Sequence, residues 1–227
     1  MPAFDVFVRG SGAVGKCLAL ALCQQGLDVA WRVPPDAPRG EDLRAFALNA
    51  GAVELLRRLR VWSSLPDDAK VGVHEMQVRG DAPGAALEFT AWQQRVGELA
   101  VIVDAAALDR QLDAALAYAS RLVRTADDVE ASLVAHCEGA DAASRAGADT
   151  GFVRSAYGQT AIAARVVASL PHRHTAWQWF RSPDVLALLP FDRPTPGRSF
   201  ALVWSLPAAR AETLAAASPS EFAAALD

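Results

Sequence analysis

The sequence predicts an α/β fold in which a Rossmann-like βαβ unit is interleaved with a second, mainly antiparallel β-sheet. The first observation is an apolar run, Phe4–Val8, followed almost directly by a Gly-x-Gly-x-x-Gly turn made by Gly10, Gly12 and Gly15. The second is a change to an apolar period of two after Val73, which is typical of strands and hairpins. Together these patterns favour a dinucleotide-binding start joined to a sheet domain.

The opening unit is predicted to contain a strand, a turn, a helix and a second strand. Ala19 and Leu22 fall within the predicted helix, Gly26 ends it, and Leu27–Trp31 has the composition of the next strand. The first glycine allows a tight turn, the second lets the backbone approach a pyrophosphate, and the third lets helix and strand pack closely. A pyrophosphate would bind the free N–H groups at the start of the helix.

One position departs from the usual dinucleotide-binding pattern. Such folds place Asp or Glu against the ribose hydroxyls, but three residues after Val29 this chain has Arg32. A guanidinium group cannot accept a hydrogen bond from a hydroxyl. Three interpretations stay open: Arg32 binds a ribose 2′-phosphate, the site binds FAD less tightly than usual, or the fold persists without a cofactor.

The composition excludes several kinds of protein. With 227 residues, 52% of them hydrophobic, the chain can bury a sizeable core. A formal net charge of −4 with scattered arginines offers no basic surface, so we expect no nucleic-acid binding. The apolar runs are shorter than the roughly 18 residues that cross a bilayer, and the first residues resemble a strand, not a secretory peptide. Three cysteines without a Cys-x-x-Cys pair indicate a reducing compartment, so we expect a cytoplasmic protein.

The remaining pattern predicts how the two parts alternate along the chain. A proline-rich loop over 33–40 precedes a helix predicted over 43–59. We expect a dinucleotide-binding domain over 1–72 and 104–150, and a sheet domain over 73–103 and 151–227. Further strands are predicted over 74–79, 86–90, 99–103, 122–123, 129–137, 160–167, 175–180, 185–189 and 200–206, with helices around Leu108–Leu116 and over 208–227, the last broken at Ser218–Pro219.

Several phrases, taken in order, resemble the FAD-dependent aromatic hydroxylases, and among these the ubiquinone-biosynthesis branch. The phrases are Leu43–Asn49 with Leu59–Trp62, Tyr157–Ala161, Thr175–Phe180, Leu186–Pro190 and Leu202–Pro207. The resemblance spans nearly the whole chain but covers only the front part of such enzymes. Their later Gly-Asp flavin motif has no counterpart before Asp227, so the substrate domain is expected to be incomplete.

The resemblance implies an FAD-dependent monooxygenase that hydroxylates an aromatic ring of a ubiquinone precursor, with NADPH or another reductant as electron donor. The flavin would carry the chemistry, so no catalytic residue is assigned. Arg32 departs from the family's acidic residue, and Glu138 takes the place of Asp in its Asp-Gly turn. The residues implied to contact the cofactor are Gly10, Gly12, Ala13, Val14, Gly15, Arg32, Arg44, Glu138 and Gly139.

Two other groups of side chains suggest ligands. Strand alternation puts Trp177 and Trp179 on one face, where they would line an apolar substrate pocket or pack in the core. His172 and His174 would share one side of a strand, but no further ligand stands at a diagnostic spacing, so we expect no metal.

The interpretations of partners and function stay open at this point. We expect an aromatic or quinone-type small molecule as substrate, with peripheral membrane contact and an oligomer or partner chain over the incomplete half of the site as further options. One alternative function is a non-catalytic partner or fragment that keeps the fold without flavin. The other is an NADP-dependent reductase, and this depends on Arg32 alone.

Overall fold

The computed structural model describes residues 3–33, 42–139 and 155–226, which group into two compact units. Unit 1 takes Met1–Asp42, Gly51–Pro66 and Ala105–Arg154, and unit 2 takes Leu43–Ala50, Asp67–Asp104 and Ser155–Asp227. The expected domain boundaries remain a proposal. They differ from the two units at residues 43–50 and 67–72, which were expected in the dinucleotide-binding domain and belong to the unit that holds the larger sheet.

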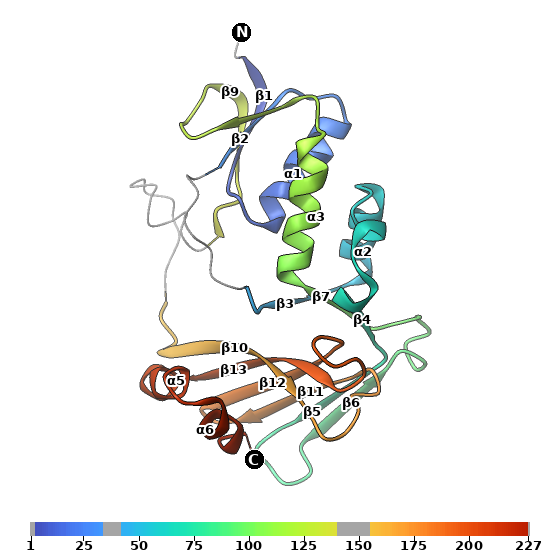
Figure 1. The fold of residues 1–227 in the computed structure, drawn as a ribbon, viewed down its shortest axis with the longest axis vertical. Helices are drawn as coiled ribbons and strands as arrows, with labels where there is room; N and C mark the ends of the chain where they lie inside the picture. Colours follow the sequence, from blue (N-terminus) through green and yellow to red (C-terminus); the bar gives the residue numbers. More distant parts are fainter. Residues whose placement is uncertain (1–2, 34–41, 140–154, 227) are drawn as a thin grey trace. The chain divides into compact units, whose positions relative to one another are not determined.

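Unit 1 is built on a four-stranded parallel sheet in the order β8-β2-β1-β9, of which β2, β1 and β9 are labelled in Figure 1. Its interior strands are apolar on both faces, and Val8 and Val29 are completely buried. Helices α1 and α3 pack against each other. The elements are β1 (Phe4–Arg9), α1 (Ala13–Gln24), β2 (Val29–Arg32), most of α2 (Ala50–Arg58), the 3₁₀ turn Trp62–Ser64, α3 (Ala105–Ala117), β8 (Leu122–Thr125) and β9 (Ala131–His136).

The prediction of a single helix over 43–59 is wrong for the first residues of this range. Residues Ala45–Leu48 form strand β3, which pairs antiparallel with β7 (Ala100–Asp104), and α2 begins only at Ala50. Phe46 and Leu48 fit the apolar pattern of either element, so the distant partner strand decides which one forms.

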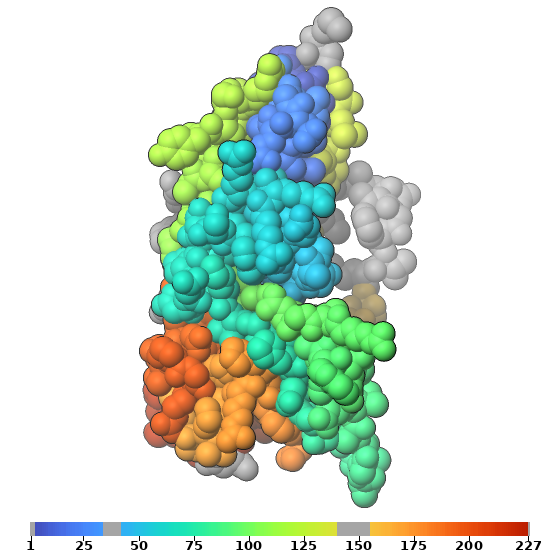
Figure 2. All heavy atoms as spheres, turned by 90° about the vertical axis from the view of Figure 1, so that its right-hand side faces the viewer, coloured from blue at the N-terminus to red at the C-terminus, as the bar shows by residue number. Residues whose placement is uncertain are grey.

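Unit 2 contains a six-stranded sheet in the order β10-β13-β12-β11-β5-β6 and a three-stranded sheet in the order β3-β7-β4. All its strand pairs are antiparallel except β5 with β11, so the predicted mainly antiparallel sheet is confirmed. The β5–β6 hairpin, coloured green, is visible on the surface in Figure 2. The strands are β4 (Lys70–Val73), β5 (Glu75–Arg79), β6 (Ala86–Thr90), β10 (Gln159–Val167), β11 (Thr175–Arg181), β12 (Asp184–Phe191) and β13 (Ser199–Pro207).

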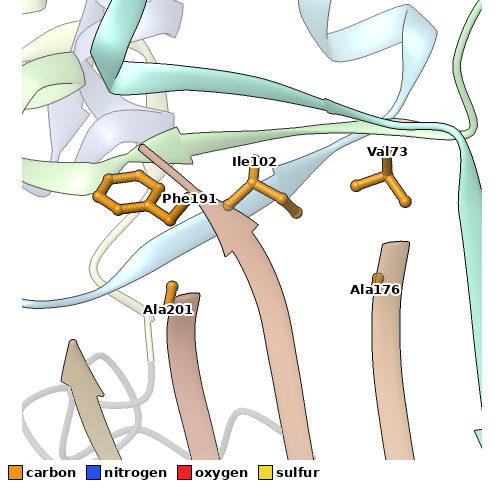
Figure 3. Packing of buried hydrophobic residues seen from close by; sticks show 5 residues of the cluster. All are labelled: Val73, Ile102, Ala176, Phe191 and Ala201. Carbon is orange, nitrogen blue, oxygen red and sulfur yellow. The ribbon is translucent and has the colours of Figure 1, made fainter. Parts of the chain in front are cut away.

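The core of unit 2 joins its two sheets. Val73 and Ile102, from the three-stranded sheet, pack with Ala176, Phe191 and Ala201, from the larger one (Figure 3). Burial of these side chains fixes the two sheets against each other within the unit.

Two short helices cover another part of unit 2. Helix α5 (Ala208–Ala215) and helix α6 (Pro219–Ala224) supply residues that pack around Trp204. The predicted break is confirmed, because Ser218 and Glu221 form a capping box at the start of α6. No helix among the described residues is long and apolar enough to span a membrane.

Candidate nucleotide site

The glycine turn after β1 is packed tightly on one side and open on the other. Gly10 has φ of 122°, and a Cβ there would come within 3.0 Å of the Cys137 carbonyl at the end of β9. A Cβ on Gly15 would approach the Gly10 carbonyl oxygen equally closely. At Gly12, by contrast, a Cβ would meet no described atom within 4 Å. The turn therefore needs glycine at two positions for packing and leaves free space beside the third.

The start of α1 is suited to an anion. Gly12 is its N-cap, no side chain among the described residues caps it, and its first turn, Ala13–Lys16, contains no acidic residue. Val14 is 71% exposed, so this end of the helix is accessible to a ligand. Unpaired backbone N–H groups and the helix dipole make such an end favourable for phosphate. The residues present therefore fit the pyrophosphate of a dinucleotide.

The turn also lies where α/β sheets bind their ligands. Strands β2 and β9 flank β1 on opposite sides, so the chain reverses its direction of winding between β1 and β9. Ligands of open α/β sheets bind at the carboxyl ends of strands that meet at such a switch point. Gly10 and Cys137 are at those ends, and the Cys137 N–H donates a hydrogen bond of 2.6 Å to the carbonyl of Arg9.

Four charged side chains gather at the carboxyl edge of the parallel sheet. Arg32 Nη1 lies 2.8 Å from Asp128 Oδ1, and Arg9 Nη2 lies 3.7 Å from Asp128 Oδ2. Arg9 Nε lies 3.7 Å from Glu138 Oε1; this nitrogen is buried and has no hydrogen-bond partner among the described residues. The guanidinium of Arg32 is therefore already compensated by a carboxylate that comes from the loop after β8.

Two thiols of unit 1, those of Cys17 and Cys137, are not poised for nucleophilic chemistry. Burial raises the pKa of Cys17 to about 11. Burial, followed by the nearby charge of Glu138, raises the pKa of Cys137. Both side chains therefore stay neutral at physiological pH and have packing roles.

The other implied cofactor residues divide between the two units. Gly139 follows Glu138 with φ of 65°, and a Cβ there would meet no described atom within 4 Å. Arg44 belongs to unit 2, where its guanidinium lies 5.9 Å from the Phe46 ring and its carbonyl accepts a hydrogen bond from Arg165 Nη2 at 3.0 Å. The role of Arg44 beside a cofactor stays a prediction.

Trp177 and Trp179 lie on the same face of β11, as their spacing predicts. Their rings stack with centroids 5.7 Å apart and an interplanar angle of 9°. Both are partly exposed, so they present a flat aromatic surface in unit 2.

The histidines do not share the side of a strand as expected. His172 and His174 lie in a turn before β11, where Arg173 and His174 have φ of 51° and 59°. His172 Nδ1 accepts a hydrogen bond from the His174 N–H, and its Nε2 lies 3.2 Å from Asp192 Oδ1. Within residues 3–33, 42–139 and 155–226, no group of three or more His, Cys, Asp or Glu residues could hold a metal ion.

Comparison with known proteins identifies the architecture. No protein-family model matches the chain. Its sequence is 29% identical over 228 residues to the ubiquinone hydroxylase UbiL of Rhodospirillum rubrum, a match that covers 88% of this chain and 51% of that protein. The structure of PqsL from Pseudomonas aeruginosa in complex with 2-aminobenzoylacetate aligns with 93% of this chain and 63% of its own, with a TM-score of 0.72 and 16% identity. HpxO from Klebsiella pneumoniae, complexed with FAD and uric acid, aligns with 90% of this chain and 56% of its own, with a TM-score of 0.62 and 18% identity.

The chain has the fold of FAD-dependent monooxygenases. The predicted resemblance to FAD-dependent hydroxylases is thereby confirmed. The chain spans about half the length of this curated relative, 51% of that protein.

The sequence analysis missed two of the four charged residues at the carboxyl edge of the parallel sheet, Arg9 and Asp128. Arg9 ends β1 directly before the glycine turn, a position that could have been noticed from the motif. Asp128 lies 96 residues beyond Arg32, and no local pattern connects them.

Proposed function

We propose that this chain forms part of an FAD-dependent monooxygenase that hydroxylates an aromatic ring, and that the ring belongs to a ubiquinone precursor. The observation that carries the proposal is the glycine turn, which is closed by packing at Gly10 and Gly15 and open at Gly12. The similarity to a ubiquinone hydroxylase supports the choice of substrate class.

In this proposal the residues of unit 1 bind and orient the cofactor. Backbone N–H groups at Ala13 and Val14 would hold the pyrophosphate, because this helix end has no side-chain cap among the described residues. Gly12 leaves the space that a diphosphate needs to approach the backbone. The bound flavin would supply the oxygen chemistry, with NADPH or another reductant as the source of electrons.

We assign the substrate side of the reaction to unit 2. The stacked Trp177 and Trp179 offer an aromatic surface on which a planar ring can pack. PqsL is named in complex with 2-aminobenzoylacetate. PnpA from Pseudomonas putida, whose structure aligns with this chain with a TM-score of 0.69 and 16% identity, is named p-nitrophenol 4-monooxygenase, and both names refer to aromatic compounds.

We favour the monooxygenase over the reductase alternative because of the contact that Arg32 makes. It requires Arg32 to bind a ribose 2′-phosphate, but the guanidinium lies 2.8 Å from the Asp128 carboxylate. A phosphate would have to displace this partner and would be repelled by it. The competing hypothesis is that the chain keeps the fold without binding flavin. One experiment distinguishes it from our proposal.

The test is FAD binding by the purified 227-residue chain and its Gly12→Ala variant. The added methyl group would meet no described atom within 4 Å, so the variant should fold, but it would occupy the space of the pyrophosphate. We expect the wild-type chain to bind FAD and the variant to bind it about tenfold or more weakly by equilibrium dialysis with absorbance detection, a loss of about 1.4 kcal/mol or more.

Gly97→Ala is the matched control. A Cβ at Gly97 also meets no described atom within 4 Å, and the residue belongs to unit 2. This variant should bind FAD as the wild type does. A wild-type chain that binds no FAD, or equal binding by all three proteins, would contradict the proposal.

A further inference from the structure

We propose that Asp128 is the carboxylate that accepts hydrogen bonds from the hydroxyls of the adenosine ribose, in place of the acidic residue that dinucleotide folds carry at the end of β2. The inference rests on the proposed function, because it needs an adenine dinucleotide in the site. It assigns to Arg32 the role of a positioning residue that holds Asp128 and does not touch the cofactor.

Strand pairing brings Asp128 to the end of β2. Strands β2 and β8 run parallel with Arg32 opposite Thr125, and the Val33 N–H donates to the Thr125 carbonyl at 3.0 Å. Asp128 follows Thr125 by three residues, so it lies at the carboxyl edge of the sheet. An acidic residue at the end of β2 would occupy this same edge.

The loop that carries Asp128 is held by specific contacts. Thr125 Oγ1 accepts a hydrogen bond from the Asp127 N–H at 3.1 Å and donates one to the Asp127 carbonyl at 2.9 Å. The contact between Arg32 Nη1 and Asp128 Oδ1, at 2.8 Å, then fixes the carboxylate. These contacts preorganise an acceptor and reduce the cost of ordering it when a ligand binds.

The carboxylate of Asp128 keeps its capacity to accept further hydrogen bonds. Each ionised carboxylate offers about four acceptor positions, and Arg32 occupies one of them. Arg9 Nη2 is 3.7 Å from Oδ2, which is beyond ordinary hydrogen-bond distance. The side chain is 58% exposed, so hydroxyl groups can reach it.

The neighbouring charged groups are less suitable for this role. The Glu138 side chain is 7% exposed and contacts Arg9 and His136. The guanidinium groups of Arg9 and Arg32 are donors only and cannot accept from a hydroxyl. Asp128 is thus the carboxylate among these four groups that a ribose can reach.

The experiment compares the wild-type chain with Asp128→Asn, using FAD, ADP and 2′-deoxy-ADP as probes in calorimetric titrations. ADP and 2′-deoxy-ADP share the adenine and the pyrophosphate and differ by one ribose hydroxyl. We expect Asp128→Asn to bind FAD about tenfold or more weakly, because a charge-assisted hydrogen bond is lost. We also expect the wild type to prefer ADP over 2′-deoxy-ADP and the variant to lose that preference.

Asp127→Asn is the matched control, since it removes the same charge from the adjacent residue, whose backbone atoms make the turn contacts. It should bind all three probes as the wild type does, and thermal melts should show that both variants fold. Equal FAD affinity in wild type and Asp128→Asn would overturn the inference. So would weaker FAD binding with an intact preference for ADP, because Asp128 would then act only through the charges of Arg9 and Arg32. A wild-type chain that binds neither FAD nor ADP overturns the proposed function first, and this inference with it.

Discussion

The indole Nε1 of Trp31 donates a hydrogen bond of 3.0 Å to the carbonyl oxygen of Gly10. The same oxygen is the atom that a Cβ on Gly15 would approach within 3.0 Å. Strand β2 and helix α1 therefore meet at one carbonyl group of the glycine turn. Trp31 is 2% exposed, so this hydrogen bond between β2 and the glycine turn is protected from water.

Replacement of Trp31 by Phe should destabilise the protein. The variant keeps an aromatic ring but loses the N–H donor, so we expect the free energy of unfolding to fall by about 1–3 kcal/mol. Urea denaturation followed by far-ultraviolet circular dichroism measures this change. Trp92→Phe, at a side chain that is 87% exposed, serves as the control and should leave stability unchanged. Equal unfolding midpoints for both variants would show that the hydrogen bond to Gly10 contributes nothing.

A buried lysine connects helices α1 and α3. Lys16 is 1% exposed, and its Nζ lies 2.6 Å from Asp109 Oδ1 and 2.8 Å from Asp113 Oδ1. Asp109→Asn together with Asp113→Asn should lower the free energy of unfolding by about 3 kcal/mol, because a buried ammonium would lose both counter-charges. Urea denaturation measures this loss.

The same lysine provides the internal control. Lys16→Met in the Asp109→Asn, Asp113→Asn background removes the unpaired charge and should restore most of the lost stability. A double variant as stable as the wild type would mean that the ammonium needs neither carboxylate.

The thiol of Cys17 should resist alkylation at neutral pH in the native protein. Because the pKa of Cys17 is raised to about 11, its thiolate at pH 7.5 is at least about a hundredfold scarcer than that of an ordinary cysteine. Iodoacetamide labelling followed by peptide mass spectrometry should find Cys17 unmodified at pH 7.5 in the native protein and modified in urea. The raised pKa also means that this thiol stabilises the fold below its unfolded pKa and that the contribution is lost as pH rises toward 11. Rapid labelling of native Cys17 at pH 7.5 would contradict this environment.

The parts of the fold that could be predicted are those determined by residues close together in the sequence. The β1–α1–β2 opening follows from the glycine spacing at Gly10, Gly12 and Gly15, and the position of Trp177 and Trp179 on one face of β11 follows from strand alternation. Strand β3 was missed because its pairing with β7 overrides an ambiguous local pattern.

The partner of Arg32 could not be predicted for a similar reason. Arg32 contacts Asp128 only because β8 pairs with β2, and the two residues are 96 positions apart. The sequence thus showed that Arg32 departs from the dinucleotide-binding pattern, whereas only the structure showed that Asp128 pairs with it.

The parallel pairing of β5 with β11 has a consequence during synthesis on the ribosome. Glu75 and Thr175, which face each other in this pair, are 100 residues apart in the chain. The β5–β6 hairpin therefore leaves the exit tunnel several seconds before its neighbouring strand has been translated, at roughly 5–20 residues per second. During that interval the edge of β5 that pairs with β11 has no partner strand, and a slower translation rate between these strands would lengthen its exposure.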